Sequence, residues 1–524
     1  MQNCNTKGEY LFVIWYSDAT TTKIKKSVIT KKNMDYLDPN KKKAHRTRLF
    51  LGYALIAVAI AIATVILVYV GSGYYIDRQT GDLIQNGQIY VNSDPEGASV
   101  YLNDKLQRAK TASKLVVPSG SYGVALKRDG YRDWIQQVQL EGGKVQRLDY
   151  ALLIPSVLKP AVVQTFATVP TDVSQSNDRR FMSLVFADKP STVLFYDETK
   201  PDLDAKVVLI DKALFSDPTK VGSLVVKEWT EDTKKVLIEN RVAGVVLDYL
   251  LISRVDGDPS VNLTKTLKLK DVSIGLKEGA SDSYFIFSKT AKTLGAINLN
   301  DKVLVPRLSG VLQYKAYNND IIAYITDTGA TKDKVQARLT DGVDKNYLLR
   351  ELPAGATSYL LDISKVGSTS VLAVGASAEN KVAVYRNPIG YLKANPNKTL
   401  PLATTILQLE NPTEVSFSTD GSIIMARGGQ KIASHYFEED RTARFVVSLP
   451  LGSERLRWTD GKHLQAVSGG SAYIFDFDGA NLQKLTDTPE QFSVYFDSNY
   501  RSLYSFSNTA KPFTMSRTLI KIVN

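Results

Sequence analysis

The hydrophobic and polar positions follow different patterns in successive parts of the chain. Residues 49–70 form an unbroken apolar run, LFLGYALIAVAIAIATVILVYV, with no charge, amide or proline. From Gly87 onward, apolar and polar residues alternate in short runs separated by turn residues such as Gly, Pro, Asn and Asp. Alternation with a period of two is typical of strands that have one buried face. The sequence therefore predicts a mostly β protein with a single N-terminal transmembrane helix.

The apolar run has the length of a membrane span. A helix of 22 residues covers about 33 Å, enough to cross a hydrocarbon layer of about 30 Å. A buried helix of a soluble domain is the alternative, but such a helix normally carries a polar stripe. A cleaved signal peptide is a second alternative. Its apolar region is normally about 7 to 15 residues long and is followed by a small-residue cleavage site, so we expect a retained anchor.

Charges on either side of the run predict its direction. Residues 1–48 hold 11 Lys and Arg against 4 Asp and Glu, a net charge of +7, whereas the connector at 71–86 begins with the almost uncharged GSGYYID. Basic residues beside a span retain that end in the cytoplasm. We therefore expect a cytoplasmic leader at 1–48, and C-terminal domains outside the membrane of the cell.

The beginning of the leader differs from the rest of it. Residues 1–33 contain a short apolar patch, LFVIWY, that no helical or alternating pattern extends. Met34 opens the segment MDYLDPNKKKAHRTR, a compact basic leader of the usual kind before an anchor. We hypothesise that the natural protein starts at Met34. An N-terminal peptide of the native protein that begins earlier would contradict this.

Net charge does not indicate a nucleic-acid partner once the leader is set aside. The whole chain carries +11, from 65 Lys and Arg against 54 Asp and Glu. Without residues 1–48 these counts become 54 and 50, so the remaining 476 residues carry only +4. The basic run KKKAHRTR is then explained by topology and by anionic lipid headgroups. The single cysteine, Cys4, lies in the leader, so we expect no disulfide in the outer domains.

Residues 87–153 read as a small module of paired strands. Ile89 and Val91 share one face of the first strand, and the turn Asp94-Pro95-Glu96-Gly97 leads into a second strand with Ala98, Val100 and Leu102 on one face. Proline presets a negative φ, and the glycine after it tolerates the positive φ of a tight turn. Further turns follow at 118–120, 129–130 and 142–143.

This module resembles a PEGA domain, a small β-sandwich named for the four residues that stand here as Pro95, Glu96, Gly97 and Ala98. The resemblance also covers the lead-in at 89–91, the strand and turn at 100–104, the turn that begins with Pro118 and contains Gly120, and the pair Gly130-Tyr131. One departure is the segment RAKTASKL, where such domains usually carry Gly-x-Thr-Pro. The resemblance implies a fold and a binding or spacing role in bacterial surface proteins.

The marked residues of the module have a structural and a functional interpretation. We expect Gly97 and Gly120 to be turn glycines, Pro95 a turn restraint and Tyr131 a packing aromatic. The alternative is a ligand platform, since aromatic surfaces bind sugars well. It would be formed by exposed side chains of Tyr101, Tyr122 and Trp134.

Beyond a proline-containing linker at 154–165, residues 166–524 contain no convincing helical pattern and repeat a common frame. The frame is an apolar residue, any residue, an aromatic, a polar turn that often contains Asp-Gly, and an apolar strand. It is clearest at Trp229, Phe417, Trp458 and Phe496, with fainter copies near Gln175, Ile274, Tyr317 and Ile363. Spacings of about 40 to 50 residues are typical of four-stranded propeller blades. The sequence therefore predicts a seven- or eight-bladed β-propeller.

The frame resembles the turns of Tol-type and WD-like propellers and of the propellers of prolyl-peptidase-like enzymes, most plainly in Trp458-Thr459-Asp460-Gly461-Lys462. This likeness implies fold and not chemistry. We expect the four clear aromatics to occupy equivalent positions on early strands and to pack between neighbouring blades. The alternative is that they are exposed and stack on a sugar.

The search for catalytic chemistry finds no specific motif. The chain has no Gly-x-Ser-x-Gly elbow, no phosphate-binding loop and no His-Glu-x-x-His. Of three histidines, only His435 and His463 lie beyond the span; with Asp460 or Asp476 they offer a weak metal alternative to a packed or solvated role. Acidic groups such as Glu231-Asp232 and Glu438-Glu439-Asp440 are expected to be solvated loop charges. We predict no cofactor and no metal.

Together these patterns predict a protein that acts by binding and is not an enzyme. We expect a bacterial, membrane-anchored envelope protein that presents the PEGA-like module and the propeller to another envelope protein or to a cell-wall or surface glycan. Two alternatives stay open. One is an envelope glycosidase or lyase with acids and histidines clustered at the mouth of the propeller, and the other is a sensor that signals through a partner.

Overall fold

A computed structural model describes residues 39–76, 81, 83–317, 321–341, 345–395, 403–452, 454–507 and 512–521. The hypothesis about Met34 falls outside these residues. The chain divides into two compact units, 1–74 and 75–524, and each is described by itself.

The first unit contains helix α1 (Pro39–Gly71). Its segment His45–Gly71 is 27 residues long and apolar enough to span a membrane, and its side chains are exposed. The helix therefore begins ten residues earlier than the predicted span at 49–70. The basic residues at its start remain compatible with helix because Lys and Arg are good helix formers.

Two four-stranded sheets form a sandwich at the start of the second unit. Alternating side chains from both sheets fill its core, among them Ile89, Val100 and Leu126. The predicted connector at 71–86 is wrong in part, because β1 and the start of β2 lie within it. One sheet contains β1 (Tyr74–Ile76), β2 (Leu83–Asp94), β5 (Ser113–Pro118) and β8 (Val145–Leu152). The other contains β4 (Lys105–Lys110), β3 (Ser99–Leu102), β6 (Gly120–Lys127) and β7 (Trp134–Leu140).

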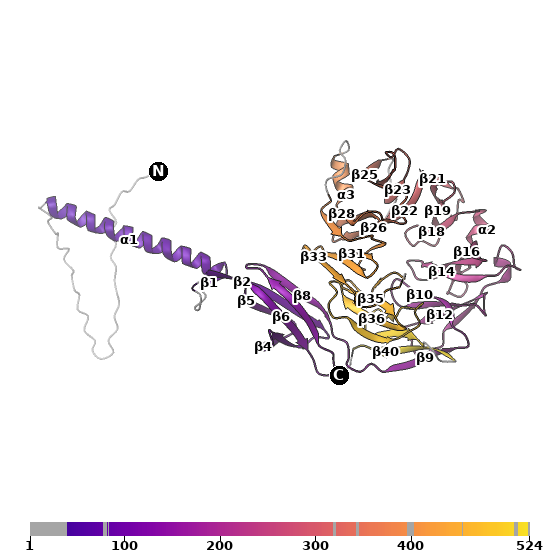
Figure 1. Ribbon diagram of the computed structural model, residues 1–524, viewed down its shortest axis with the longest axis horizontal. Helices are drawn as coiled ribbons and strands as arrows, with labels where there is room; N and C mark the ends of the chain where they lie inside the picture. Colours follow the sequence, from indigo (N-terminus) through magenta and orange to yellow (C-terminus); the bar gives the residue numbers. More distant parts are fainter. Residues whose placement is uncertain are drawn as a thin grey trace, which may run out of the picture. The chain divides into compact units, whose positions relative to one another are not determined.

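In the described part of the unit, eight further four-stranded antiparallel sheets follow, which Figure 1 shows arranged in a ring as successive blades of a β-propeller. Seven of the sheets are formed by four consecutive strands each, so the ring is built largely from local hairpins.

The strand bounds follow chain order. The first two sheets are β10 (Pro170–Gln175), β11 (Phe181–Phe186), β12 (Thr192–Asp197), β13 (Lys206–Leu209), and β14 (Ser223–Trp229), β15 (Lys235–Val242), β16 (Val245–Ser253), β17 (Val261–Asn262). The third and fourth are β18 (Ser273–Leu276), β19 (Ser283–Ser288), β20 (Thr293–Asn298), β21 (Val305–Ser309), and β22 (Val311–Tyr317), β23 (Ile321–Thr326), β24 (Lys334–Asp341), β25 (Asn346–Pro353).

The fifth and sixth sheets are β26 (Tyr359–Val366), β27 (Thr369–Ala376), β28 (Lys381–Arg386), β29 (Thr405–Gln408), and β30 (Glu414–Phe417), β31 (Ile423–Gly428), β32 (Lys431–Tyr436), β33 (Arg441–Val446). The seventh is β34 (Arg457–Trp458), β35 (His463–Ser468), β36 (Ser471–Asp476), β37 (Gln483–Asp487). The eighth joins β38 (Tyr495–Phe496), β39 (Ser502–Phe506) and β40 (Phe513–Leu519) to β9 (Pro160–Phe166).

Strand β9 closes the ring and corrects the predicted linker at 154–165. It pairs antiparallel with β40, so that Phe166 lies opposite Phe513 and Pro160 opposite Thr518. Because β9 is the outer strand of its sheet, proline at its start removes no ladder hydrogen bond that a central strand would need. The propeller thus begins at Pro160 and not at residue 166.

Short helices interrupt the strands, contrary to the expectation of none. They are the 3-10 turn η1 (Lys212–Leu214), α2 (Leu263–Leu267) and α3 (Pro388–Ala394). The Asn262 side chain caps α2 by accepting from the Lys265 N–H, and Pro388 occupies the first turn of α3. Helices this short contain too few residues for a helical sequence period to identify them.

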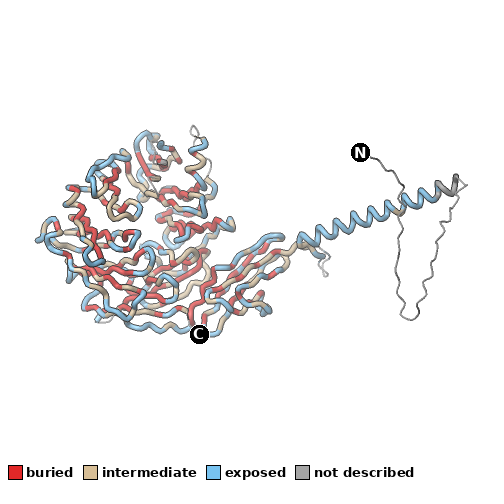
Figure 2. The backbone as a smooth tube through the Cα atoms, turned by 180° about the vertical axis from the view of Figure 1, so that it is seen from behind, coloured by how far each residue is buried: buried red, intermediate tan, exposed pale blue. Residues whose placement is uncertain are grey.

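Burial changes across each sheet in the same way. The middle strands β11 and β39 are buried on both faces, whereas outer strands such as β13 alternate between half-buried and exposed residues (Figure 2). Apolar clusters join neighbouring sheets; Phe195 and Trp229 meet in one of them at 5.7 Å between ring centres. Each blade therefore buries its faces against its neighbours.

Candidate functional site

The PEGA turn is held by one hydroxyl group that the sequence did not single out. Gly97 has a φ of +89°, which glycine adopts without strain. Thr111 Oγ1 accepts from the N–H groups of Gly97 at 3.0 Å and Ala98 at 2.9 Å, and it lies 2.7 Å from Ser93 Oγ. Thr111 lies in the segment RAKTASKL, where the chain departs from the usual motif. Pro95, Gly97 and Ala98 thus have structural surroundings, and Glu96 is exposed.

The other marked residues of the module also serve packing and turns. Tyr131 is buried and forms an isolated β-bridge with Pro155. The N–H of Ser156 donates to the carbonyl of Gly130 at 2.9 Å, so this turn fixes the exit of the chain from the sandwich. Gly120 begins β6.

The alternative of an exposed aromatic platform at Tyr101, Tyr122 and Trp134 is wrong for Trp134. The side chain of Trp134 is fully buried. Tyr101 and Tyr122 are half-buried; the Tyr122 hydroxyl donates to the Pro118 carbonyl at 2.7 Å, and Lys127 Nζ lies 5.4 Å from the centre of the Tyr101 ring. Trp134 is buried because it contacts the seventh sheet of the propeller.

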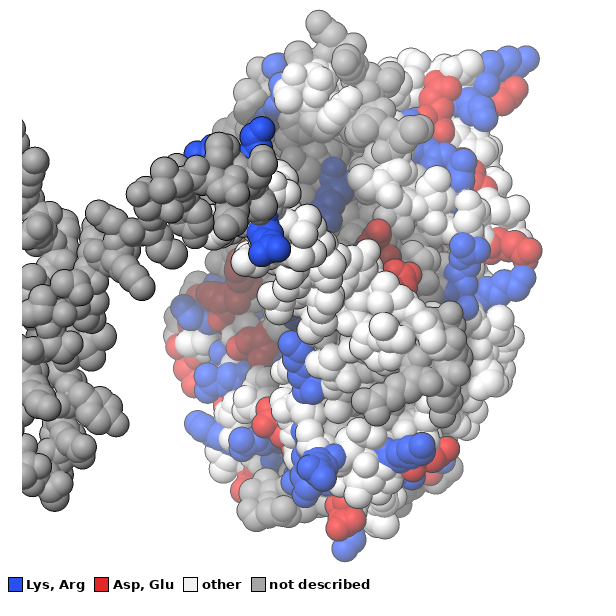
Figure 3. Space-filling model, turned by 90° about the vertical axis from the view of Figure 1, so that its left-hand side faces the viewer, with Lys and Arg blue, Asp and Glu red and all other residues white. Residues whose placement is uncertain are grey.

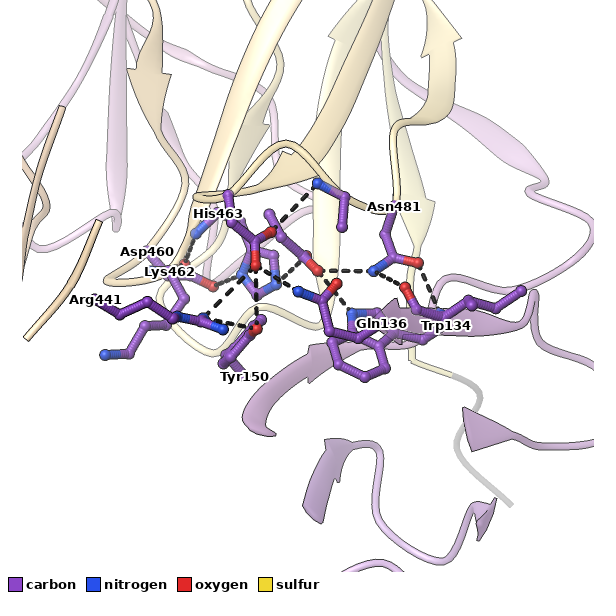
Figure 4. Close-up of polar contacts among 12 residues, drawn as sticks. Trp134, Gln136, Tyr150, Arg441, Asp460, Lys462, His463 and Asn481 are labelled. Carbon is purple, nitrogen blue, oxygen red and sulfur yellow. Dashed lines mark hydrogen bonds and ion pairs between the residues drawn. The ribbon is translucent and has the colours of Figure 1, made fainter. Parts of the chain in front are cut away.

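A buried polar cluster joins Trp134 to that sheet (Figure 4). Its indole Nε1–H donates to Asp476 Oδ2 at 2.9 Å, and Asn481 Nδ2 donates to the same oxygen at 2.8 Å. His463 lies on the other side of this carboxylate, with Nε2 3.4 Å from Asp476 Oδ1 and Nδ1 2.7 Å from Asp460 Oδ2. One imidazole therefore lies between two carboxylates.

This arrangement makes His463 a buried cation. Burial alone lowers the pKa of His463, but the adjacent carboxylates of Asp460 and Asp476 outweigh it and raise the pKa to about 10. The charge and hydrogen bonds of His463, in return, outweigh the burial of Asp460 and lower the pKa of that carboxyl. His463 is thus packed, which is one of the two predicted roles, whereas its charge was not predicted. The described residues contain no group of three ligands arranged to hold a metal.

A second polar group lies beside the first. Gln136 Nε2 donates to Asp478 Oδ2 at 2.6 Å, and Arg441 Nη2 donates to the Tyr150 hydroxyl at 3.0 Å while lying 3.6 Å from Asp478. Glu439 accepts from the Arg147 N–H at 2.8 Å. Burial raises the pKa of Asp478 and of Glu439. The prediction that Glu439 is a solvated loop charge is therefore wrong.

Apolar side chains complete this junction between the sandwich and the propeller. Ile423, Tyr436 and Phe477 belong to the same buried cluster as the core of the sandwich. The rings of Tyr150 and Phe477 meet edge to face at 5.2 Å between centres. Since both the apolar core and the polar groups continue across the junction, the sandwich and the sixth and seventh sheets form one packed body.

The four repeat aromatics occupy equivalent positions. Trp229, Phe417, Trp458 and Phe496 are the last residues of β14, β30, β34 and β38, the first strands of their sheets. Three are buried, and Trp458 is half-buried with its Nε1 donating to Ser416 Oγ of the neighbouring sheet at 3.0 Å. No continuous sugar-stacking face arises from rings packed in this way.

The polar turn after each aromatic has a physical explanation. In the sixth sheet, Asp420 Oδ1 accepts from Ser418 Oγ at 2.7 Å and from the Ser422 N–H at 3.0 Å, while Ile423 N–H donates to Ser418 Oγ at 3.0 Å. The first two sheets repeat this pattern with Ser176 and Asp178 and with Thr230 and Asp232. A side-chain cap thus starts each of these second strands.

Side chains also link the first strands of neighbouring sheets around the centre of the ring. The Asp172 carboxylate accepts from the Val226 N–H at 2.8 Å, and Glu228 accepts from the Leu276 N–H at 2.7 Å. Burial raises the pKa of both carboxyl groups. Further links of this type are Gln313 to the Tyr359 carbonyl, Asp362 to the Phe417 N–H and Gln175 to the Phe496 carbonyl.

A cavity of about 420 Å³ opens between these strands, at the mouth of the propeller. The charged side chains that line it are Arg179, Lys227 and Arg457 against the single carboxylate Asp172. Both oxygens of Asp172 already accept backbone N–H groups. Glycoside hydrolysis needs two carboxyl groups that face each other across the substrate, whereas three cations and several amides suit the binding of an anionic or hydroxyl-rich ligand.

His435 has a structural environment as well. It is buried, its Nδ1 lies 2.9 Å from Thr442 Oγ1, and burial lowers its pKa. It lies on β32 of the sixth sheet. The described residues that line the mouth of the propeller include no histidine.

The fold and the junction define the class of protein. It is a mostly β chain with one N-terminal apolar helix, a small sandwich and a β-propeller. Residues 86–154 match the PEGA domain family, within one residue of the predicted bounds at each end. The chain therefore carries a PEGA domain. The comparison with curated proteins found no match.

Solved structures resemble the propeller. Hsv2 of Kluyveromyces lactis is 12% identical, with a TM-score of 0.39 over 63% of this chain and 98% of that one. The Cps50 (Swd1) β-propeller domain of Myceliophteria thermophila is 10% identical, with a TM-score of 0.33 over 70% and 100% of the chains. A functionally unknown protein of Desulfotomaculum acetoxidans is 11% identical, with a TM-score of 0.35 over 58% and 95%.

Proposed function

We propose that this protein is a membrane-anchored scaffold of the bacterial cell envelope that binds a protein or glycan outside the membrane. The observation that carries the proposal is the buried junction of the PEGA domain with the propeller. Because His463, Asp476 and Trp134 are buried together, the two domains form one body, and any ligand of the propeller is held relative to the PEGA domain. Fixed presentation of binding surfaces is the task of a scaffold.

The charge asymmetry around the apolar helix supports the orientation. Basic residues precede the apolar run and the domains follow it, so we place the leader in the cytoplasm and the domains outside the membrane. On the face drawn in Figure 3, basic and acidic side chains are interspersed. A nucleic-acid partner would favour a continuous basic stripe, so we place the partner among envelope proteins and glycans.

Binding is favoured over hydrolysis by the mouth of the propeller. Its single lining carboxylate, Asp172, is engaged by two backbone N–H groups, and its three lining cations offer no general base at neutral pH. The propeller mouth is thus proposed as a recognition surface in a protein that is not an enzyme.

The test compares retention with turnover. The purified full chain in detergent is incubated with cell-wall and surface-glycan fragments of defined length and with extracted envelope proteins. We expect saturable retention of a ligand class with no change in fragment length over hours. Time-dependent shortening of a glycan would contradict the proposal and favour the glycosidase or lyase alternative.

A further inference from the structure

A second hollow lies between the second and third sheets of the propeller, and Lys227 from the lining of the mouth donates to Ser273 at its edge at 2.9 Å. It has a volume of about 770 Å³ and is largely apolar. Its lining includes Val245, Leu247, Leu269, Val272 and Phe287. The side chain of Val245 is 68% exposed although it is apolar. A concave apolar surface of this size on a folded domain indicates a place where another molecule binds.

The rim of this groove is basic. Lys265, Lys268, Lys270 and Lys289 line it and are exposed, against the single acid Asp271. Lys265 Nζ lies 3.3 Å from the carbonyl of Ala213, and in the described part of the chain none of the four lysines forms an ion pair with a carboxylate. Four exposed cations beside an apolar floor complement a partner that is both acidic and apolar.

One wall of the groove is an open strand edge. Strand β17 pairs with only Leu250 and Leu251 of β16, whereas β33 pairs with six residues of its neighbour. The Tyr249 N–H is taken by Thr264 Oγ1 at 2.9 Å. Residues 245–247 of β16 therefore have no fourth strand against their outer edge within the described residues, whereas Asp248 is fully buried and helix α2 contacts the strand. An uncovered edge offers main-chain groups to an incoming strand.

We propose that this groove binds an extended acidic segment of a partner protein. The segment adds as a strand along residues 245–247, its apolar side chains cover Val245 and Leu269, and its carboxylates face the lysines. A phosphate headgroup or an anionic glycan would satisfy the lysines but leave the apolar floor and the strand edge uncovered. The proposal rests on the scaffold function above and names a partner class for it.

The test uses the full chain in detergent and a fluorescent peptide of about eight residues, the length of a typical strand, in which Glu alternates with Val and Leu. Fluorescence anisotropy should show saturable binding. The double variant Lys268→Glu/Lys270→Glu should weaken it by roughly tenfold or more, because two attractions become repulsions. The matched control Lys200→Glu/Lys332→Glu makes the same charge change at exposed lysines elsewhere on the propeller and should stay within roughly twofold of wild type.

Three further probes test the binding mode. N-methylation of alternate peptide residues on one edge should abolish binding, because strand addition needs those N–H groups. Equal binding of the N-methylated peptide or of an all-Glu peptide would overturn the proposal in favour of general anion attraction. Displacement of the peptide by glycerophosphate, a soluble form of a phospholipid headgroup, would also overturn it. If the Lys268→Glu/Lys270→Glu variant fails to bind the peptide but still retains a glycan or envelope protein, the scaffold function holds and this groove is not the site of that ligand.

Discussion

His463 offers the most informative perturbation, since it is a buried cation between the carboxylates of Asp460 and Asp476. His463→Gln preserves much of the side-chain volume and removes the charge. Asp476 is almost fully buried, so the variant leaves a carboxylate without its cation. Removing one partner of a buried ion pair typically costs about 3–5 kcal/mol. We expect a loss of stability of that order at pH 7.

The pH dependence gives a second, independent readout. The pKa of His463 is raised from 6.5 to about 10 in the folded chain, so its contribution to stability is fully present below pH 6.5. That contribution is lost as the pH rises through about 10. The charged groups that face the imidazole are Asp460 and Asp476, while Lys462 and Asp478 lie nearby. The difference between wild type and His463→Gln should therefore shrink between pH 7 and pH 10.

The assay is urea unfolding of the full chain in detergent, followed by tryptophan fluorescence at several pH values between 6 and 10. Trp134 lies at the junction and reports on its separation. A matched control is His435→Gln, which removes a buried histidine whose pKa burial lowers and whose only neighbouring carboxylate among the described residues, Asp440 at 3.7 Å, is exposed. A stability difference between wild type and His463→Gln that does not change with pH would refute the assignment of His463 as a buried cation.

The other structural predictions concern turns and packing. Gly97→Val should destabilise the chain by about 1–3 kcal/mol and Gly97→Asn by less, since Gly97 has a positive φ and open space around it; equal effects in thermal unfolding would refute the turn. Gly421→Ala should destabilise the sixth sheet, because the added carbon would lie 2.3 Å from the Lys365 carbonyl oxygen; hydrogen exchange in 414–446 measures this. Trp229→Ala should destabilise the chain by about 3–5 kcal/mol, and Trp458→Ala by less because Trp458 is only half-buried. Trp229→Phe should be milder than Trp229→Ala, since the buried Trp229 Nε1 has no hydrogen-bond partner. An unchanged thermal midpoint for both alanine variants would contradict the packing role.

Local patterns in the sequence were sufficient to predict the span, the PEGA domain and the propeller class. Alternation identifies strands, and the recurring aromatic with its polar turn marks where a first strand ends and a second begins. This is possible because blades are built from consecutive hairpins, so that Trp229 or Phe417 meets its partners near in sequence or in the adjacent sheet.

Contacts between distant segments were not predictable in the same way. Trp134 begins a strand of alternating buried and exposed residues, and the sequence does not show that the carboxylate it meets, Asp476, lies more than 300 residues away. Strand β9 was read as a linker because its partner, β40, is at the other end of the chain. Glu439 was predicted to be solvated, and the charge of His463 was not predicted, for the same reason. In this strand, one sequence feature pointed to a buried polar contact: Gln136 is a polar residue on an otherwise apolar strand face.

The central claim is that the PEGA domain and the propeller face the outside of the membrane. It is tested most directly by labelling single cysteines in intact cells with a membrane-impermeant maleimide, in a Cys4→Ser background. Leu209→Cys, at a side chain that is 76% exposed in the first propeller sheet, should be labelled without lysis. Asp38→Cys in the basic leader should react only after the membrane is opened. The reverse pattern, with Asp38→Cys labelled in intact cells and Leu209→Cys protected, would contradict the account.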